Sequence, residues 1–257
     1  MKRMIRTNWS MCVGVLVGCL CISAPAYAAD ELLQMMLDKA RYLQSLGKSD
    51  QSAEAWRKVL VASPGNREAL LWLGMSEAYA GNTDSANEYA ERFAQAGGKA
   101  QTVKALRRAI EMGRPDAFQL DRARKLAQSG NAEEAVAAYK KAFRQIEPSG
   151  HLALEYYQTL SAVPDAWEGS KAGLKHLVEE FPDQPIFQHA YAKHLSYRES
   201  TRREAIRRLE RLVTDRTVGK QALQDLRQAV EWLQVGAADE RLLNRLARKW
   251  PNDKQIN

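Results

Sequence analysis

Residues 73–86 read LGMSEAYAGNTDSA, a helix-forming segment, a Gly81-Asn82 turn and the beginning of a second helix. Gly47 stands 34 residues before Gly81, and Trp56 stands 34 residues before Ala90. Self-similarity at a fixed period of this size indicates a stack of repeated units rather than one conventional globular core.

A period of 34 residues is typical of the tetratricopeptide repeat (TPR), in which each unit is a pair of antiparallel helices. Ala86 is the small residue that lets the second helix of its pair approach the first. Copies of the pattern begin near residues 33, 67, 116, 151, 185 and 220. We therefore predict an all-α TPR superhelical solenoid of about six repeats, whose stacked pairs share one core and form a concave groove.

The spacing of the repeats is interrupted once. Gly81 and Gly130 lie 49 residues apart, which exceeds one period by 15. Apolar residues recur at helical spacing in the surplus, between Gly97-Gly98 and Gly113-Arg114-Pro115. This predicts an extra, unpaired helix at 101–112, between a first block of two repeats (29–100) and a second block of four (116–257). Residues 101–115 are then either a hinge or a spacer that keeps the stacking continuous.

The N-terminus has the layout of a secretory signal peptide. Lys2, Arg3 and Arg6 precede an apolar stretch at 11–22, and Ala26-Tyr27-Ala28 fits a peptidase site. We expect residues 1–28 to be removed and the mature chain to reside in the periplasm. Cys12, Cys19 and Cys21 all fall in this segment, so the mature chain is expected to fold without disulfides. Lipidation of Cys19 is the alternative, because Leu16-Val17-Gly18-Cys19 is similar to a lipobox.

Composition narrows the functional classes. An apolar fraction of 45% and a charged fraction of 27% fit a folded chain, and a mean hydropathy of -0.48 excludes a polytopic membrane protein. Loss of Lys2, Arg3 and Arg6 lowers the net charge from +7 to +4. Most basic residues are interleaved with acidic ones, so nucleic acid is not an expected partner.

The sequence lacks the common motifs of catalytic and cofactor sites. Dinucleotide-binding, P-loop, zinc-protease and serine-hydrolase signatures are absent from the sequence. His189 and His194 are five residues apart and would not converge on a metal from one helix face. The sequence therefore predicts no catalytic residues, no metal and no cofactor, and the protein is not expected to be an enzyme.

Charge is densest between residues 198 and 211, which carry Arg198, Arg202, Arg203, Arg207, Arg208 and Arg211. Glu199, Glu204 and Glu210 are threaded through these arginines. A solvated helix face is the favoured interpretation, and contact with anionic envelope material such as lipid head groups is the alternative.

The first helix of each TPR pair conventionally turns one face towards the groove. Projected on this sequence, that face comprises Arg41, Leu71, Met75, Tyr79, Arg124, Gln128, Glu155, Thr159, His189, Lys193, Tyr197, Gln228 and Trp232. Such a groove is polar and contains three aromatic residues, which suits a sugar chain or an extended peptide. We assign Trp56 and Tyr139 to the core instead, because they occupy the bulky site of the second helix.

Several segments resemble one known family. Residues 119–124 (QLDRAR), 129–139 (SGNAEEAVAAY), 154–157 (LEYY) and 202–205 (RREA) are similar to the N-terminal region of bacterial cellulose synthase operon protein C. In that family a signal peptide precedes periplasmic TPRs and a C-terminal outer-membrane barrel that exports cellulose. The resemblance implies a non-catalytic scaffold that contacts other cellulose synthesis or export proteins and, as a further expectation, the β-glucan chain.

Two expectations depend on the chain beyond the repeats. The last pair stops near Pro251 without a capping helix, so we expect the native chain to continue past Asn257. Membrane association would then come from a C-terminal barrel that is not in this sequence or, alternatively, from a lipidated Cys19. A stand-alone periplasmic or lipid-anchored TPR adaptor for another envelope assembly is the second functional hypothesis.

Overall fold

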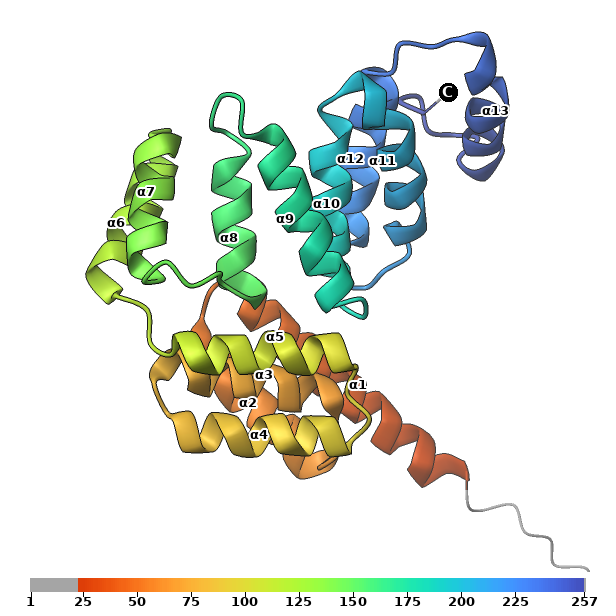
Figure 1. Cartoon of the computed structure of the whole chain (residues 1–257). Helices are drawn as coiled ribbons and strands as arrows, with labels where there is room; N and C mark the ends of the chain where they lie inside the picture. The colour runs from red at the N-terminus through yellow and green to blue at the C-terminus, as the bar shows by residue number, and fades with distance from the viewer. Residues whose placement is uncertain (1–22, 257) are drawn as a thin grey trace, which may run out of the picture.

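The computed structural model of the protein describes residues 23–256, so Cys19 and most of the predicted signal peptide lie outside the described residues. This part of the chain contains α-helices, one 3-10 helix and no β-strand (Figure 1). The α-helices are α1 (Ser23–Ser45), α2 (Ser49–Ala62), α3 (Arg67–Ala80), α4 (Thr83–Gln95), α5 (Ala100–Met112), α6 (Ala117–Gln128), α7 (Ala132–Ala142), α8 (Gly150–Leu160), α9 (Trp167–Glu180), α10 (Pro185–Ser196), α11 (Glu199–Leu212), α12 (Gly219–Glu231) and α13 (Glu240–Lys249). The 3-10 helix η1 (Ala237–Asp239) precedes α13.

Neighbouring helices form the pairs α1/α2, α3/α4, α6/α7, α8/α9 and α10/α11, and each pair stacks on the next within a block. This is the TPR solenoid that the sequence predicts. We keep the name first block for α1–α4 and second block for α6–α13. None of the helices in the described region combines the length and apolar character needed to cross a membrane.

The glycines that reveal the period share one backbone role. Gly47, Gly81 and Gly130 follow the first helix of their pairs with φ angles of +68°, +84° and +83°. This left-handed conformation costs a residue with a Cβ atom about 1–2 kcal/mol, whereas glycine adopts it without strain. The 34-residue recurrence therefore reflects a turn geometry that each pair needs.

Small alanines and large aromatic residues pack together in the core of the helix pairs. Ala86 and Ala135 have no exposed surface, and Trp56 and Tyr139 are 1% and 2% exposed. The expectation that both aromatic residues belong to the core is confirmed. The Trp56 indole N–H donates to Gln44 Oε1 at 2.9 Å, which fixes the orientation of that amide.

Helix α5 is the surplus helix of the sequence pattern. It packs against α3, α4 and α9, and Leu106 and Ala109 are buried in these contacts. Gly74 makes room for it, because a Cβ at this position would lie 3.1 Å from Leu106 Cδ2. The helices of the first block and α5 run across the direction of α6–α12, so the solenoid turns at this point (Figure 1).

The second block folds back onto the first. One hydrophobic core passes from α1–α5 into α8–α11, whereas α6 and α7 contribute to a separate cluster. Trp72 on α3 packs against Phe181 and Phe187, with ring centroids 6.3 Å away in both cases. The two blocks therefore share apolar surface across the turn, and mobility of residues 101–115 as a hinge stays a prediction.

The last pair is looser than the others. Helix α13 stands apart from α12 in Figure 1 and joins the core through Leu242 and Leu246. Arg203 on α11 fixes the segment before α13, since its Nε and Nη2 atoms each lie 2.7 Å from a carboxylate oxygen of Asp239. This guanidinium also holds the pKa of Asp239 below its ordinary value.

Candidate functional site

The inner face of the first block is covered by the second block. Leu71 and Met75 are each 3% exposed, and a Cβ at Gly150 of α8 would lie 3.5 Å from Met75 Cε. The Tyr79 hydroxyl donates to the carbonyl oxygen of Ser149 at 2.7 Å, and burial raises its pKa. The expectation that Leu71, Met75 and Tyr79 face an open groove is therefore wrong, because Leu71 is buried and the beginning of α8 lies against Met75 and Tyr79.

Several of the predicted groove residues instead join successive first helices of the repeats. Arg41 Nε donates to Glu68 Oε1 at 2.9 Å, and Arg124 Nε donates to Glu155 Oε2 at 2.9 Å. The sequence projection placed these residues on one face, but it did not identify Glu68 as a partner. The partners lie 27 and 31 residues after their arginines, which is short of the 34-residue period, so the period alone does not identify them.

Helices α10 and α12 are joined in the same way. His189 Nε2 lies 2.8 Å from Asp225 Oδ2, and Lys193 Nζ lies 3.2 Å from Asp225 Oδ1. Burial opposes ionisation of Asp225, but the hydrogen bond with His189 and the charge of Lys193 outweigh it and lower its pKa. Asp225 is a further residue that the sequence projection missed.

The remaining groove residues are more accessible. Gln128 is exposed, Thr159 donates to the Glu155 carbonyl, and Gln228 Nε2 donates to Glu231 Oε2 at 3.1 Å. Tyr197 follows α10 and Trp232 follows α12; their side chains are 49% and 42% exposed. Their ring centroids are 6.0 Å apart, so they form one exposed aromatic pair.

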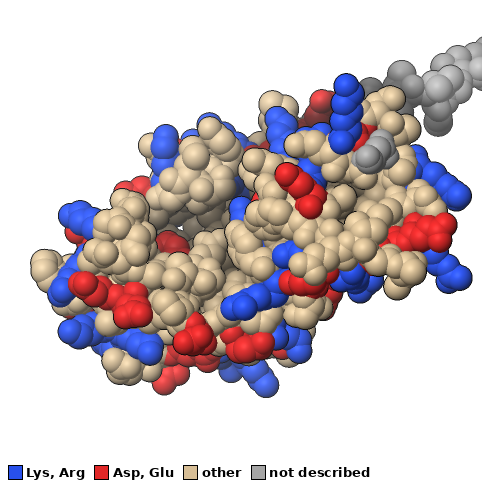
Figure 2. Space-filling view, turned by 90° about the horizontal axis from the view of Figure 1, so that it is seen from above, with Lys and Arg blue, Asp and Glu red and all other residues tan. Residues whose placement is uncertain are grey.

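The arginines of α11 are largely used inside the fold. Arg202 is 8% exposed and donates to the carbonyl oxygens of Ser196 and Trp232 at 2.8 and 2.7 Å. Arg208 lies over the Tyr191 ring, 4.9 Å from its centroid. Figure 2 shows basic and acidic side chains interspersed on the viewed face. The prediction of a solvated helix face holds only for part of this cluster, because Arg202 and Arg203 connect α11 to the segment after α12.

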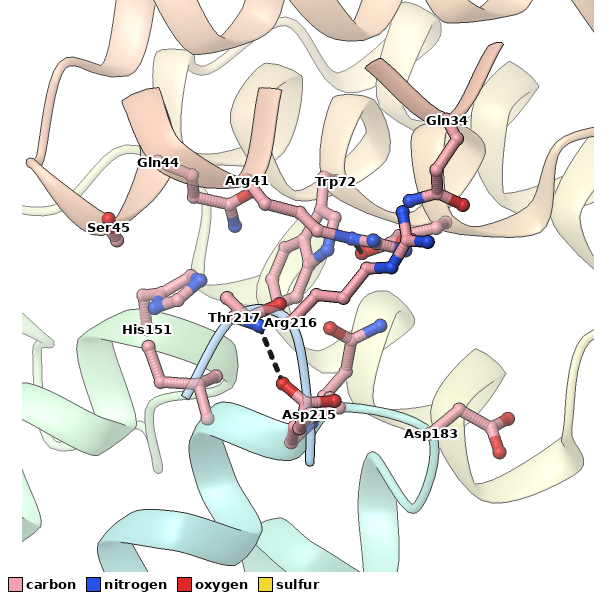
Figure 3. Close-up of a pocket in the computed structure, with 14 residues that line it drawn as sticks. Gln34, Arg41, Gln44, Ser45, Trp72, His151, Asp183, Asp215, Arg216 and Thr217 are labelled. Atoms are coloured by element: carbon pink, nitrogen blue, oxygen red, sulfur yellow. Dashed lines mark hydrogen bonds and ion pairs between the residues drawn. The ribbon is translucent and has the colours of Figure 1, made fainter. Parts of the chain in front are cut away.

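A pocket of about 310 Å³ lies where the blocks meet. We call it the junction pocket. Its walls come from α1 and α3 on one side and from the beginning of α8, the α9–α10 turn and the α11–α12 turn on the other (Figure 3). Its lining comprises Gln34, Arg41, Gln44, Ser45, Glu68, Trp72, His151, Asp183, Gln184, Pro185, Ile186, Asp215, Arg216 and Thr217. Of the predicted groove residues, only Arg41 lines it.

His151 is a neutral histidine on the wall of this pocket. Its ring centroid lies 4.7 Å from that of Trp72 and 5.6 Å from that of Phe187. Burial among these rings disfavours the charged imidazolium and lowers the pKa of His151 to about 4.

We expect this histidine to make the fold sensitive to mild acid. The His151 pKa is about 4 when folded and near 6.5 when unfolded, so the unfolded chain binds more protons between these values. The free energy of unfolding should fall by about 2 kcal/mol between pH 7 and pH 5 through this residue. Urea titrations of the wild type and of His151→Gln at both pH values measure this change. Equal losses in the two proteins would show that His151 is not held neutral by the fold.

No cluster of three or more His, Cys, Asp or Glu side chains suited to a metal ion occurs within the described part of the chain. The titratable groups described above are engaged in ion pairs between helices or in packing. The accessible features described above are an exposed aromatic pair at the ends of α10 and α12 and a polar pocket at the junction.

Comparisons with known proteins identify similar chains. The chain is 34% identical over 247 residues to cellulose synthase operon protein C of Xanthomonas axonopodis pv. citri, covering 95% of this chain and 16% of the relative. It is 29% identical over 244 residues to the protein of the same name from Pseudomonas fluorescens, covering 94% of this chain and 19% of the relative. The chain thus spans less than a fifth of the length of these curated relatives.

A solved structure supports the fold. The flexible tandem repeat domain of the C component of bacterial cellulose synthase superposes with a TM-score of 0.50 at 22% sequence identity, covering 87% of this chain and 92% of that domain. No family model matches the sequence.

Proposed function

Because this chain is a homologue of cellulose synthase operon protein C over nearly its whole length, we propose that it is a non-catalytic TPR scaffold in the periplasmic part of a cellulose synthesis and export system. In this role it contacts partner proteins of the system and the β-glucan chain itself. The observation that carries the proposal is the similarity over 95% of this chain to a protein of that operon.

The second block supplies the surface for these contacts. The Tyr197–Trp232 pair exposes two aromatic rings at the ends of neighbouring first helices, and its members are 49% and 42% exposed. Aromatic faces of this kind cover the C–H faces of sugar rings, while nearby polar groups meet hydroxyls. Lys193 on α10, whose side chain is 46% exposed, provides such a polar group.

In this proposal the ionic side chains between the helices have a structural and not a catalytic role. Arg124–Glu155 and His189–Asp225 tie one helix to the next and are satisfied within the fold. Such contacts orient helices and support the solenoid, whereas a catalytic pair needs a site beside it where a reacting atom can lie.

We expect a Tyr197→Ala/Trp232→Ala double variant to lower the cellulose output of cells that carry it in place of the wild-type chain. Loss of two aromatic contacts should weaken binding of a glucan by about tenfold or more. Phe118→Ala is the matched control, because Phe118 is an exposed aromatic residue on α6 with 72% of its surface accessible. Cellulose per cell, with the amount of chain checked by immunoblot, measures the effect.

Isothermal titration with cellotetraose separates the two kinds of contact. Heat that disappears in the double variant and persists in Phe118→Ala supports direct glucan binding by this pair. Loss of cellulose without any heat in the wild type leaves only the contact with partner proteins. Unchanged cellulose output in the double variant would contradict the proposed role of the pair.

A further inference from the structure

The junction pocket has the size of a site for a small ligand. Its volume of about 310 Å³ lies at the lower end of the ~300–1,000 Å³ range of small-molecule sites. Such sites often lie between domains, and here the walls come from α1 and α3 of the first block and from three segments of the second (Figure 3).

The pocket contains polar groups that the protein leaves without partners. Trp72 is 5% exposed, and its indole N–H has no hydrogen-bond partner among the described residues. Figure 3 shows this indole directed into the space between Arg41 and Thr217. The Trp72 indole nitrogen is not among the buried side-chain atoms that lack a partner, so this N–H can be reached from the pocket. An acceptor that enters the pocket would therefore meet a prepared donor.

Gln44 and His151 add to this set. Gln44 Oε1 accepts from Trp56, so the amide NH₂ of Gln44 is left to face the pocket without a protein partner in the described structure. The ring nitrogens of His151 likewise have no partner among these residues, and Figure 3 shows the ring below Gln44. A neutral imidazole offers one donor and one acceptor.

Most charged side chains on the wall already have a partner of opposite charge, which favours a neutral ligand. Arg216 Nη1 lies 3.6 Å from Asp38 Oδ2, and Lys99 Nζ lies 2.7 Å from Asp183 Oδ1. Both Arg41 Nε and Arg41 Nη1 are engaged, by Glu68 at 2.9 Å and Asp38 at 3.2 Å, so this guanidinium is not free for an anion. Asp215 Oδ1 accepts from the backbone N–H groups of Thr217 and Val218 at 2.8 and 3.0 Å, which leaves Oδ2 to accept from a hydroxyl. The wall therefore offers a ligand hydrogen-bond donors and acceptors rather than a free guanidinium at Arg41.

We propose that the junction pocket binds a glucose unit at an end of a β-glucan chain, with the Trp72 indole and the Gln44 amide donating to its hydroxyl oxygens and Asp215 accepting from a hydroxyl. Hydroxyls both donate and accept, which matches this set of groups, whereas an extended peptide needs a groove that is open along several residues. This assignment rests on the proposed function for the choice of sugar. It concerns a site separate from the Tyr197–Trp232 pair.

Occupation of the pocket would hold the two blocks together. A ligand that contacts α3 and the α11–α12 turn at once binds the docked arrangement and not an undocked one, so it stabilises docking by mass action. Amide hydrogen exchange at the beginning of α8 should slow as cellotetraose is added.

The test is an NMR titration of the ¹⁵N-labelled chain with cellotetraose, observed at the tryptophan indole N–H resonances. The indole resonance that is absent from the spectrum of Trp72→Phe is assigned to Trp72. In the wild type this resonance is expected to shift as cellotetraose is added. Trp72→Phe should weaken binding at this site by about two- to tenfold, as expected for one hydrogen bond. Trp167→Phe is the matched control, because its indole N–H likewise has no protein partner and Trp167 does not line the pocket.

The possible outcomes distinguish a failure of the pocket assignment from a failure of the proposed scaffold function. A Trp72 resonance that stays fixed at millimolar cellotetraose while the Trp232 resonance shifts would overturn the pocket assignment and leave the Tyr197–Trp232 surface intact. A shift of Trp72 with a neutral Gly-Ser peptide and not with cellotetraose would also overturn it. An equal loss of affinity in Trp72→Phe and Trp167→Phe would show a general effect on folding and would contradict a direct contact.

Discussion

Arg108→Met is expected to lower the free energy of unfolding by about 3 kcal/mol, the lower end of the ~3–5 kcal/mol cost of breaking a buried ion pair. Arg108 Nη2 on α5 lies 2.7 and 2.9 Å from the two carboxylate oxygens of Glu180 at the end of α9. The Glu180 side chain is only 5% exposed, so methionine would leave a carboxylate inside the junction without its main partner. The remaining neighbour, His176 Nε2, lies at the longer distance of 3.3 Å from Glu180 Oε1.

Urea unfolding followed by circular dichroism measures this loss, and hydrogen exchange locates it at the end of α9. Lys99→Met is the control, since Lys99 and Asp183 also join α5 to the second block but are 43% and 67% exposed. An exposed pair of this kind contributes about 0–1 kcal/mol. Similar losses in the two variants would contradict a special role for the buried pair.

Glu180→Gln should cost less than Arg108→Met. Arg108 is 23% exposed and can turn part of its guanidinium to water, whereas the Glu180 carboxylate cannot. The hydrogen bond from Thr102 Oγ1 at 2.6 Å goes to the Glu180 carbonyl oxygen, so it survives this change. A larger loss of free energy of unfolding in Arg108→Met than in Glu180→Gln would therefore show that the unpaired buried charge costs more than the lost contact.

The repeat architecture follows from the sequence because its determinants are local. The turns at Gly47, Gly81 and Gly130 need a positive φ, and the buried alanines such as Ala86 sit where two helices of one pair touch. Each of these features acts within one repeat or between neighbours, so a single period reveals them. The extra helix at 101–112 is visible for the same reason, as a surplus of helical pattern.

The docking of the second block onto the first is not local, and the sequence does not reveal it. Tyr79 and Ser149 are 70 residues apart, and Arg108 and Glu180 are 72 apart. A repeat pattern specifies contacts between successive units only, whereas these contacts depend on the direction in which the solenoid turns after α5. For this reason Met75 and Tyr79, which the periodic pattern assigns to an open groove, lie beneath α8. The junction pocket is created by the same turn and was equally invisible.

In the second block, the sequence did not reveal how the predicted groove residues pair with one another. His189, Lys193, Tyr197 and Trp232 lie on neighbouring helices, but Asp225 joins the first two and leaves mainly the aromatic rings accessible. Side-chain partners across helices depend on the rise and rotation of each repeat. The copies that begin near residues 116, 151, 185 and 220 are 35, 34 and 35 residues apart, so a strict 34-residue projection could not assign these partners.

Gly173→Ala is expected to destabilise the protein by about 2 kcal/mol, although alanine is normally the better helix residue. Glycine inside a helix costs about 1 kcal/mol relative to alanine, so this change would stabilise an isolated α9. A Cβ on Gly173 would, however, lie 2.1–2.3 Å from three ring atoms of Tyr157 on α8. Overpacking of this kind costs about 1–3 kcal/mol or more, because the ring must leave its place.

The displaced ring would lose two contacts. The Tyr157 hydroxyl donates to Glu147 Oε1 at 3.1 Å, and its ring lies edge-on to Tyr156 with centroids 5.1 Å apart. Gly169→Ala on the same helix is the matched control, since a Cβ there would only reach an ordinary contact of 3.8 Å with Leu160 Cδ2. Urea unfolding should show a loss for Gly173→Ala and a gain of up to about 1 kcal/mol for Gly169→Ala.

A double-variant cycle identifies the cause of the loss. In a Tyr157→Ala background the ring is absent. Gly173→Ala should then leave the free energy of unfolding unchanged or raise it, instead of lowering it. The difference between the two backgrounds measures the clash between α8 and α9 directly. If Gly173→Ala destabilises both backgrounds equally, the requirement for glycine comes from another neighbour, and the close approach of α9 to the Tyr157 ring is not what selects it.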